Sequence, residues 1–236
     1  ALIMSIPFVL ACCCTRGLKE GQQLFTGLKP IEYSNYEKSG YADTTMLEME
    51  NVLASAPNGA LFGSSYYRTP FPVRLWIWNA FSQSEGGVAK WITKAFGSKP
   101  KLMSNVNPQL RAQVAENQLG KYGYFNGKVT YDVVTDNNPK KAKVAYHVDM
   151  GHLWTLDTVK YLGFPNEGQQ LIDSTRNLAV IRTGSPFNIS KLEQERQRIT
   201  RLFRNNGYYF YKNGYASYLA DTLGTPGKAE VRLIMA

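Results

Sequence analysis

The sequence has few of the residues on which disulfide frameworks, zinc sites and membrane helices depend. Its 236 residues include three cysteines, adjacent at positions 12–14, and two histidines. A disulfide framework needs cysteines spaced along the chain, and a structural zinc site needs four nitrogen or sulfur ligands, so both are excluded. Beyond the N-terminus there is no apolar run of about 20 residues, so we predict no spanning helix.

Charged residues are also scarce, at 19%, whereas 44% of the residues are apolar. Disorder of the whole chain would need the opposite composition. The 27 Lys and Arg exceed the 18 Asp and Glu by nine, so the chain is basic. The 15 Tyr and 11 Phe favour sheet-containing structure over a helical bundle.

No motif places a catalytic nucleophile or a phosphate-binding loop. Gly97-Ser98-Lys99 lacks the spacing of a P-loop. His147 and His152 are expected to be structural or solvent-facing, because no nucleophile is placed beside either. We therefore predict no catalytic residues, no metal site and no cofactor, and we expect that the chain is not an enzyme.

The N-terminal 11 residues resemble the apolar region of a signal peptide, and they are too short to span a bilayer. They end in Val9-Leu10-Ala11-Cys12, with a bulky apolar residue three positions before the cysteine and a small one directly before it. This pattern resembles the lipobox of bacterial lipoproteins. It implies that Cys12 is acylated and that residues 12–26 are a tether; the alternative is three free thiols in a flexible tail.

A repeat organises the rest of the chain. Lys121–Lys128 is similar to Asn205–Lys212 when Gly123 is aligned with Gly207, an offset of 207 − 123 = 84 residues. Helical periodicity precedes each glycine and a hairpin pattern follows it. We predict a left-handed helix cap at both glycines.

Each copy is predicted to have the order β-α-α-β-β. In the first copy the expected elements are a strand over 28–33, helices over 44–54 and from Pro108, capped by Asn107, and a hairpin over 128–134 and 142–148. In the second copy they are a strand over 154–163, a helix over 166–180, a helix from Ser190, and strands over 211–219 and 229–235.

The second helix of the second copy is predicted to begin with a capping box formed by Ser190 and Glu193. Its other charged residues, Glu195 and Arg198 among them, are expected on a solvated face. The fold class is α+β, with two tandem domains over 27–149 and 150–236. Each domain is expected to place two helices on a small three-stranded sheet.

The second copy carries a series of motifs, namely Gly184-Ser-Pro-Phe187, Leu192-Glu193, Arg196, Ile199 and Asn205-Asn-Gly-Tyr-Tyr209. With the β-α-α-β-β order, this series resembles the polypeptide-transport-associated (POTRA) domains of outer-membrane barrel-assembly proteins such as BamA and TamA. The lipobox makes the chain most similar to the lipid-anchored TamL-type branch. The resemblance is weaker over residues 28–56.

The resemblance implies a periplasmic arm at the outer membrane of a Gram-negative bacterium, anchored by lipid. The implied partners are unfolded outer-membrane barrel proteins, the lipid around the acyl anchor, and a periplasmic or inner-membrane assembly protein, with no nucleic acid. Client strands are expected to add to an edge strand of each domain. The expected edge residues are Lys128, Thr130, Asp132, Tyr211, Tyr215 and Tyr218. The alternatives are an arm of a two-partner secretion transporter and a periplasmic interaction scaffold.

An insertion over residues 61–103 departs from the short POTRA domain. It contains six Lys and Arg, one acid, Glu85, and three of the four tryptophans. Two short amphipathic helices are expected, over 76–81 and 88–96. The insertion is expected to be an elaboration packed on its own domain, a membrane surface or a protein-binding surface. The contact residues would be Trp76, Trp78, Lys90, Trp91 and Lys94.

Overall fold

The computed structural model describes Thr15 and residues 17–235, so the predictions on the signal peptide and on Cys12 lie outside the described residues. By its internal contacts the chain forms two units. The first comprises the residues up to Tyr33, Met46–Ala115 and Val129–Val148, and the second comprises Ser34–Thr45, Glu116–Lys128 and Asp149–Ala236. The predicted domain boundaries at 27, 149 and 236 stay a prediction.

The first sheet is built around its last strand. Strand β4 (Lys141–Asp149) pairs with β1 (Leu24–Leu28) in parallel, with β2 (Glu32–Ser34), and with its hairpin partner β3 (Lys128–Thr135). The predicted hairpin is thus confirmed. The expected single strand over 28–33 is wrong: it is divided into β1 and β2, with Pro30, which has no amide to donate, between them.

The predicted tether is also too long. Leu24 and Phe25 are only 1% exposed and belong to β1, and Leu18 is buried as well. An apolar residue at 18, 24 and 25 has more to gain in the core than in a solvated linker.

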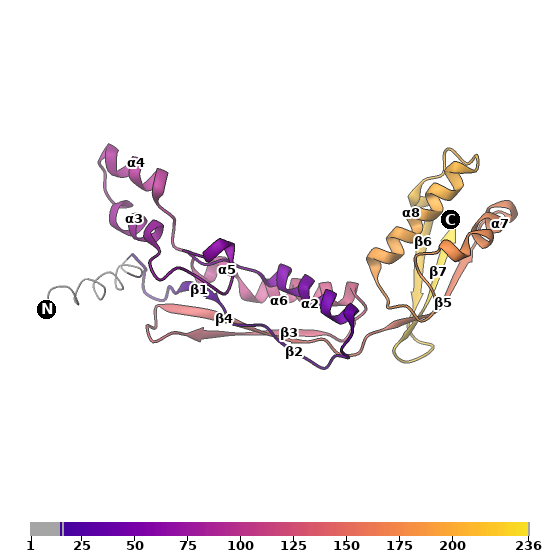
Figure 1. The fold of residues 1–236 in the computed structure, drawn as a ribbon, viewed down its shortest axis with the longest axis horizontal. Helices are drawn as coiled ribbons and strands as arrows, with labels where there is room; N and C mark the ends of the chain where they lie inside the picture. The colour runs from indigo at the N-terminus through magenta and orange to yellow at the C-terminus, as the bar shows by residue number, and fades with distance from the viewer. Residues whose placement is uncertain (1–14, 16, 236) are drawn as a thin grey trace. The chain divides into compact units, whose positions relative to one another are not determined.

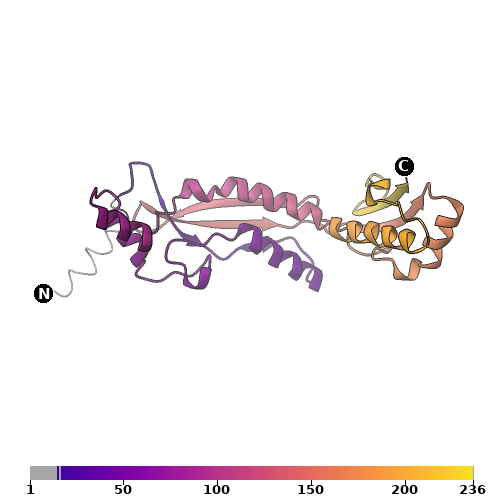
Figure 2. The ribbon, with the colours of Figure 1, turned by 90° about the horizontal axis from the view of Figure 1, so that it is seen from above.

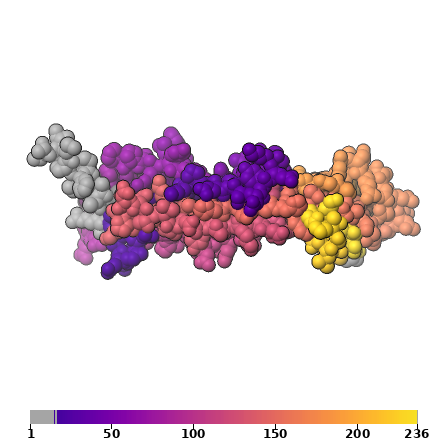
Figure 3. All heavy atoms as spheres, turned by 90° about the horizontal axis from the view of Figure 1, so that it is seen from below, coloured from indigo at the N-terminus to yellow at the C-terminus, as the bar shows by residue number. Residues whose placement is uncertain are grey.

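Helices α2 (Gly40–Leu53) and α6 (Pro108–Lys121) lie on one face of this sheet and run side by side (Figures 1 and 2). Helix α6 turns Ala112, Ala115 and Leu119 inward, as its periodicity predicts. Asn107 accepts a hydrogen bond from the Leu110 amide at 3.3 Å, so the predicted cap is confirmed. Figure 3 looks onto the opposite face, where β3 and β4 are open to view.

Four short helical segments lie in the insertion or begin at its last residue. They are η1 (Leu61–Gly63), α3 (Val73–Phe81), α4 (Gly87–Phe96) and α5 (Met103–Val106). The two expected amphipathic helices are therefore present, with α3 beginning three residues earlier than expected. Helix α3 joins the unit through Leu75, which packs with Leu18 and Leu24.

The second unit contains a sheet in the order β5-β7-β6. Its strands are β5 (Thr155–Leu162), β6 (Ala216–Asp221) and β7 (Lys228–Met235), and its helices are α7 (Asn166–Ser174), α8 (Ile189–Asn205) and the short η2 (Arg176–Leu178) and η3 (Asn213–Tyr215). Strand β5 runs parallel to β7, and β6 is antiparallel to it. The predicted fold class, α+β with two tandem units, is confirmed, but the first sheet has four strands instead of the expected three because the expected first strand is divided into β1 and β2.

Three element predictions in this unit are wrong. The helix predicted to reach residue 180 ends at Ser174, where the Thr175 hydroxyl donates to the Leu171 carbonyl, and Leu178 is 63% exposed. The cap of α8 is Asn188, not Ser190; the Asn188 side chain accepts from the Lys191 amide at 3.1 Å. The strand expected from Tyr211 begins at Ala216, because residues 213–215 form a 3₁₀ turn.

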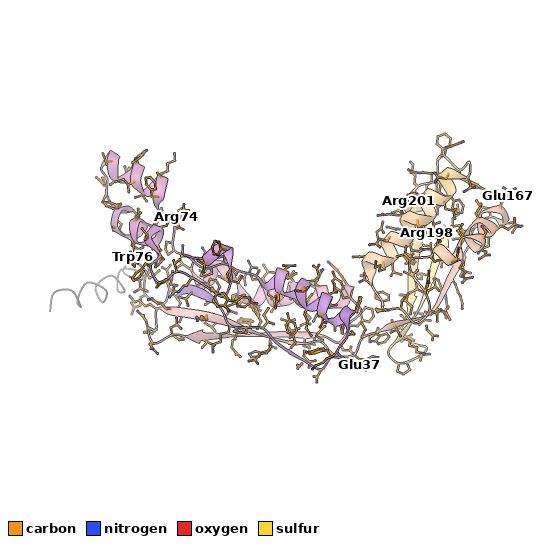
Figure 4. All side chains as sticks on the ribbon, viewed as in Figure 1. Glu37, Arg74, Trp76, Glu167, Arg198 and Arg201 are labelled. Carbon is orange, nitrogen blue, oxygen red and sulfur yellow. The ribbon has the colours of Figure 1, made fainter. Side chains whose placement is uncertain are left out.

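The charged face predicted for α8 is wrong at Glu195, which is fully buried. Its carboxylate accepts from Tyr161 Oη at 2.7 Å, the Val180 amide at 2.8 Å and the Arg198 guanidinium at 2.7 and 2.9 Å. Burial opposes ionisation, but the hydrogen bonds from Arg198, Val180 and Tyr161 hold the pKa of Glu195 below its ordinary value. Figure 4 marks Arg198 on α8.

Both glycines of the repeat have the predicted left-handed backbone, with φ of 88° at Gly123 and 96° at Gly207. They differ in their surroundings. A Cβ on Gly123 would lie 2.6 Å from the Phe187 carbonyl oxygen, whereas a Cβ on Gly207 would meet nothing within 4 Å. Two equivalent helix ends are therefore under different packing constraints.

Candidate functional site: the open strand edges

A strand at the edge of a sheet offers unpaired amides and carbonyls to another chain, so each edge of the two sheets is a candidate site. In the first sheet, the outer edge of β1 is covered by the insertion. The Phe25 amide donates to the Lys101 carbonyl at 2.8 Å, and the Leu28 amide donates to the Ser65 carbonyl at 2.8 Å. Leu24 also forms an antiparallel bridge with Leu102. This edge is already paired within the chain.

In the second sheet, the segment before α8 covers the outer edge of β5 in the same way. The Leu156 amide donates to the Ser185 carbonyl at 2.8 Å, and the Gly184 amide returns a bond to the Leu156 carbonyl at 2.7 Å. Further along β5, the Arg176 guanidinium donates to the Val159 carbonyl at 3.1 Å. Each unit thus protects its parallel edge strand with the chain that leads into its second long helix.

Besides the three-residue β2 at the end of the path β1-β4-β2, the remaining edges are formed by β3 and β6. Among the strands that the structure describes, β3 pairs with β4 and β6 pairs with β7, so each has one side outside the ladder. The geometry therefore brings the candidate site to two equivalent strands. The sequence predicted both as edges, although it placed the start of β6 five residues too early.

The edge at β3 is charged. Lys128 forms an ion pair with Glu116 at 3.1 Å, and Asp132 lies 3.2 Å from Nε2 of His147, whose Nδ1 lies 2.9 Å from Glu32. Thr130, between the two charged positions, is exposed. Charged side chains on an edge strand oppose the pairing of a further strand.

The edge at β6 is less charged. Ser217, Leu219 and Ala220 are exposed, Leu219 by 57%, and the only ionisable acid in the strand is Asp221 at its end. The antiparallel register runs without a break from Ala216 opposite Met235 to Asp221 opposite Glu230. A regular strand of this kind is a better template for a further strand than a bulged one.

The three tyrosines predicted at this edge differ in secondary structure and in burial. Tyr211 is buried and stacks on Phe203, with ring centroids 4.7 Å apart, so its prediction as an edge-strand residue is wrong. Tyr215 lies in the 3₁₀ turn before β6 and is 44% exposed. Tyr218 lies in β6, but its ring packs against the core and burial raises the pKa of its hydroxyl. Only the backbone of Tyr218 is available to an added strand.

The tryptophans and lysines predicted as a contact surface of the insertion also differ in their burial. Trp76 packs against the Leu18, Leu24 and Leu75 cluster, and Figure 4 marks it on α3. Trp78 is half-buried with the Lys99 ammonium 5.6 Å from its ring centroid. Trp91 is 63% exposed, and Lys90 and Lys94 are exposed on the same helix, α4. Trp76 and Trp78 therefore contribute to the fold of the insertion.

A groove of about 640 Å³ lies in the first unit, with Arg74, Lys99 and Lys101 among its lining residues. Its polar atoms hold the insertion together: Asn58 accepts from the Lys101 amide at 2.6 Å, and Lys101 Nζ donates to the Ala56 carbonyl at 2.8 Å. Burial, and then the nearby Arg111, lower the pKa of Lys101.

Within the described residues no group of three or more His, Cys, Asp and Glu side chains gathers as a metal site. In this same part of the chain, no helix is long and apolar enough to cross a membrane.

No family model matches the sequence, and no curated protein matches it. Solved structures do match. The POTRA3–5 segment of BamA from Haemophilus influenzae matches at 10% identity over 93% of this chain and 99% of its own, with a TM-score of 0.33. POTRA1–2 of Omp85 from Anabaena matches at 12% identity over 92% and 98%, with a TM-score of 0.35. CdiB from Acinetobacter baumannii matches at 10% identity over 93% of this chain, which spans 30% of CdiB, with a TM-score of 0.33. These scores do not by themselves assign the chain to a family.

The sequence did not single out Leu219, the most exposed apolar side chain of β6. The sequence also did not indicate that residues 101–103 cover the edge of β1 and that residues 184–187 cover the edge of β5. Backbone pairing of this kind joins segments that are far apart in the sequence, and no local periodicity indicates it. In the second unit the signal that could have found it is the motif Gly184-Ser-Pro-Phe187, whose turn residues precede the cap of α8.

Proposed function

We propose that the chain is the periplasmic, lipid-anchored arm of an outer-membrane protein assembly or translocation factor, and that it binds client β-strands by adding them to β6. One observation carries the proposal: in each sheet the parallel edge strand, β1 or β5, is closed by the chain's own backbone, whereas the antiparallel edge strand, β3 or β6, has one side outside the ladder. A strand added to an open edge gains backbone hydrogen bonds with little demand on its sequence. Such binding suits a factor that handles many barrel proteins.

The charge of the two edges favours β6 over β3. Barrel strands alternate apolar and polar residues, so a client strand brings an apolar side chain to every second position. At β6 it meets Leu219, whereas at β3 it meets the ionic group of Asp132, His147 and Glu32. We assign β3 the role of a weaker, second edge.

The anchor rests on the sequence around Cys12. Acylation there holds the arm at the outer-membrane surface, and mass spectrometry of the mature N-terminus tests it. A diacylated or triacylated Cys12 is the expected result, and an unmodified N-terminus contradicts the anchor while leaving strand binding untouched.

Two adjacent proline substitutions test strand binding. Neighbouring residues of a strand direct their amides to opposite sides, so of Leu219→Pro and Ala220→Pro one removes an outward amide and the other an amide of the β6–β7 ladder. Both side chains are exposed, so neither variant empties the core. Melting temperature and binding of a ten-residue barrel-strand peptide are measured for each.

The variant with the outward proline is expected to keep its melting temperature and to bind the peptide several-fold more weakly, by up to about tenfold. A folded variant that binds the peptide as tightly as the parent chain contradicts the proposal. Ser217→Lys with Leu219→Lys provides a second test, because it charges the edge without removing any amide. Thr130→Pro is the matched control on β3 and is expected to have a smaller effect on peptide binding.

A further inference from the structure

Helix α4 presents an apolar face that the rest of the first unit does not cover. Val88 is 74% exposed and Trp91 63% exposed, and together with Ala95 they recur at the i, i+3, i+7 spacing of one helical face. The Trp91 ring meets the edge of Phe96, itself 52% exposed, with centroids 5.9 Å apart. In this helix Ala89 and Ile92 are half-buried and Thr93 is buried, so Val88, Trp91, Ala95 and Phe96 are the apolar side chains left exposed.

Cations flank this face. Lys90 and Lys94 are one turn apart and exposed, and within the described residues neither is paired with a carboxylate. The insertion from 61 to 103 contains six Lys and Arg and one acid, Glu85. An exposed Trp and Val face beside a row of lysines has the composition of a helix that lies in the headgroup region of an anionic membrane.

The attachment of α4 leaves the face accessible. It packs on α3, and Figure 1 shows it beyond α3 on the side away from β1–β4. Helix α3 in turn holds the N-terminal segment, since Leu18 packs on Leu75. Cys12 is six residues before Leu18, a span of at most about 21 Å when fully extended.

We infer that the exposed face of α4, formed by Val88, Trp91 and Ala95 with Lys90 and Lys94 beside it, lies on an anionic membrane surface. The inference rests in part on the proposed anchor, because an acyl chain on Cys12 would hold α4 within reach of the bilayer that it enters. The helix supplies a second point of attachment, separate from the acyl chains on Cys12. It would also fix how the first unit is oriented on the membrane.

Vesicle binding tests the contact without the anchor. The full chain with Cys12→Ser is mixed with vesicles of phosphatidylglycerol and phosphatidylethanolamine, and with neutral phosphatidylcholine vesicles. Binding to the anionic vesicles is expected, and Lys90→Glu with Lys94→Glu is expected to weaken it by at least about 30-fold, the product of two lysine contributions of about 1 kcal/mol each. The matched control is Lys38→Glu with Lys212→Glu, which changes the net charge equally at two exposed positions elsewhere.

Equal weakening by the two double variants would mean a non-specific charge effect and would overturn the inference. The depth of insertion is measured by the quenching of tryptophan fluorescence with brominated lipids. Quenching is expected for the parent chain and is expected to be largely lost in Trp91→Phe. Quenching that persists in Trp91→Phe places another tryptophan in the bilayer and contradicts the role of α4. A concentration-dependent dimer that Trp91→Phe abolishes would make a second copy the occupant instead. Because the protein lacks Cys12, all these results are independent of whether the anchor exists.

Discussion

The two units repeat one order of strands and helices, but they hold their charged side chains in opposite environments. In the first sheet His147 lies between Glu32 and Asp132 with side-chain exposures of 40, 76 and 72%. In the second unit Glu195 and Arg198 form a pair with exposures of 0 and 13%. The first group stays in water, where ion pairs contribute little, and the second is removed from it.

The buried pair depends on complete hydrogen bonding. Both oxygens of Glu195 accept, from Tyr161, the Val180 amide and Arg198. Arg198 also donates to the Thr175 hydroxyl at 3.1 Å, so the pair joins α8 to β5 and to the end of α7. At the position of α6 that aligns with Glu195 (195 − 84 = 111), the first copy has Arg111, which donates to the Val52, Ala54 and Val106 carbonyls. The same topology thus places a carboxylate at this position in one copy and a guanidinium that binds backbone carbonyls in the other.

The largest expected effect comes from breaking the buried pair. Glu195→Ala leaves the Arg198 guanidinium and the Val180 amide without their acceptor, and we expect it to lower the free energy of unfolding by about 3–5 kcal/mol. Urea denaturation of the parent and variant chains measures the difference. A loss below about 1 kcal/mol would show that Glu195 is solvated in solution.

The same residue gives the second unit a pH dependence. Because the folded pKa of Glu195 is lowered, its contribution to stability is present above the unfolded value, about 4.5, and is lost as the pH falls through the folded pKa. Glu195→Gln removes this titrating group, so the unfolding free energy of the variant is expected to fall less steeply below about pH 4.5 than that of the parent chain. Urea midpoints across pH 3 to 7 measure both slopes, and parallel slopes would contradict the assignment.

The paired glycines sharpen the comparison. Gly207→Ala places a Cβ in open space on a left-handed backbone and is expected to cost about 1–2 kcal/mol. Gly123→Ala adds a clash with the Phe187 carbonyl, which is expected to cost about 1–3 kcal/mol more. Thermal unfolding of both variants tests which of them loses more stability. Equal losses would mean that the backbone around Phe187 moves to accommodate the added methyl group.

The helix caps are expected to differ by less. Asn188 caps α8 and also donates to Tyr41 Oη at 2.9 Å, so Asn188→Ala is expected to cost about 1–2 kcal/mol. Asn107 caps α6 from a left-handed backbone, with φ of 46°. Asn107→Gly relieves that backbone while losing a 3.3 Å bond, so its change is expected within about 0.5 kcal/mol. Chemical denaturation compares the stability of the two variants. A larger loss of stability at Asn107 would mean that Asn107, and not Asn188, is the stronger helix cap.

The smallest effect is expected at the exposed ionic group. His147→Gln is expected to change stability by less than about 1 kcal/mol, because all three groups face water. Denaturation at low and high salt measures it. A loss of several kcal/mol would mean that the open face of the first sheet is covered in solution.

Much of the fold could be predicted from the sequence because local periods determine it. The β3–β4 hairpin follows from alternation over residues 128–148, and the helix ends follow from Gly123 and Gly207. Glu195 was missed although a signal existed: it lies three residues after Leu192 and four before Ile199, on the buried face of α8. Its charge outweighed its position in the prediction.

Other features have no local signal. The sequence places Asn188 and Ser190 two residues apart, and either can cap a helix, so the choice depends on where Phe187 packs. The start of β6 depends on Tyr211, whose burial against Phe203 turns the chain before the strand. The candidate edges could be predicted from the order of the elements, but which edges the chain closes itself could not.

The parallel pairing of first and last strands determines when each unit can fold. Leu24 pairs with Lys141, 141 − 24 = 117 residues later, and Thr155 pairs with Lys228, 228 − 155 = 73 residues later. The difference in loop-closure free energy is only about 0.4 kcal/mol, so the insertion adds little to the thermodynamic cost. It adds time instead: during synthesis from the N-terminus, the first sheet cannot be completed until residue 141 emerges. Until then β1 lacks its partner β4, and its earlier partners are Ser65 and Lys101 of the insertion, which emerge 76 and 40 residues sooner (141 − 65 = 76 and 141 − 101 = 40).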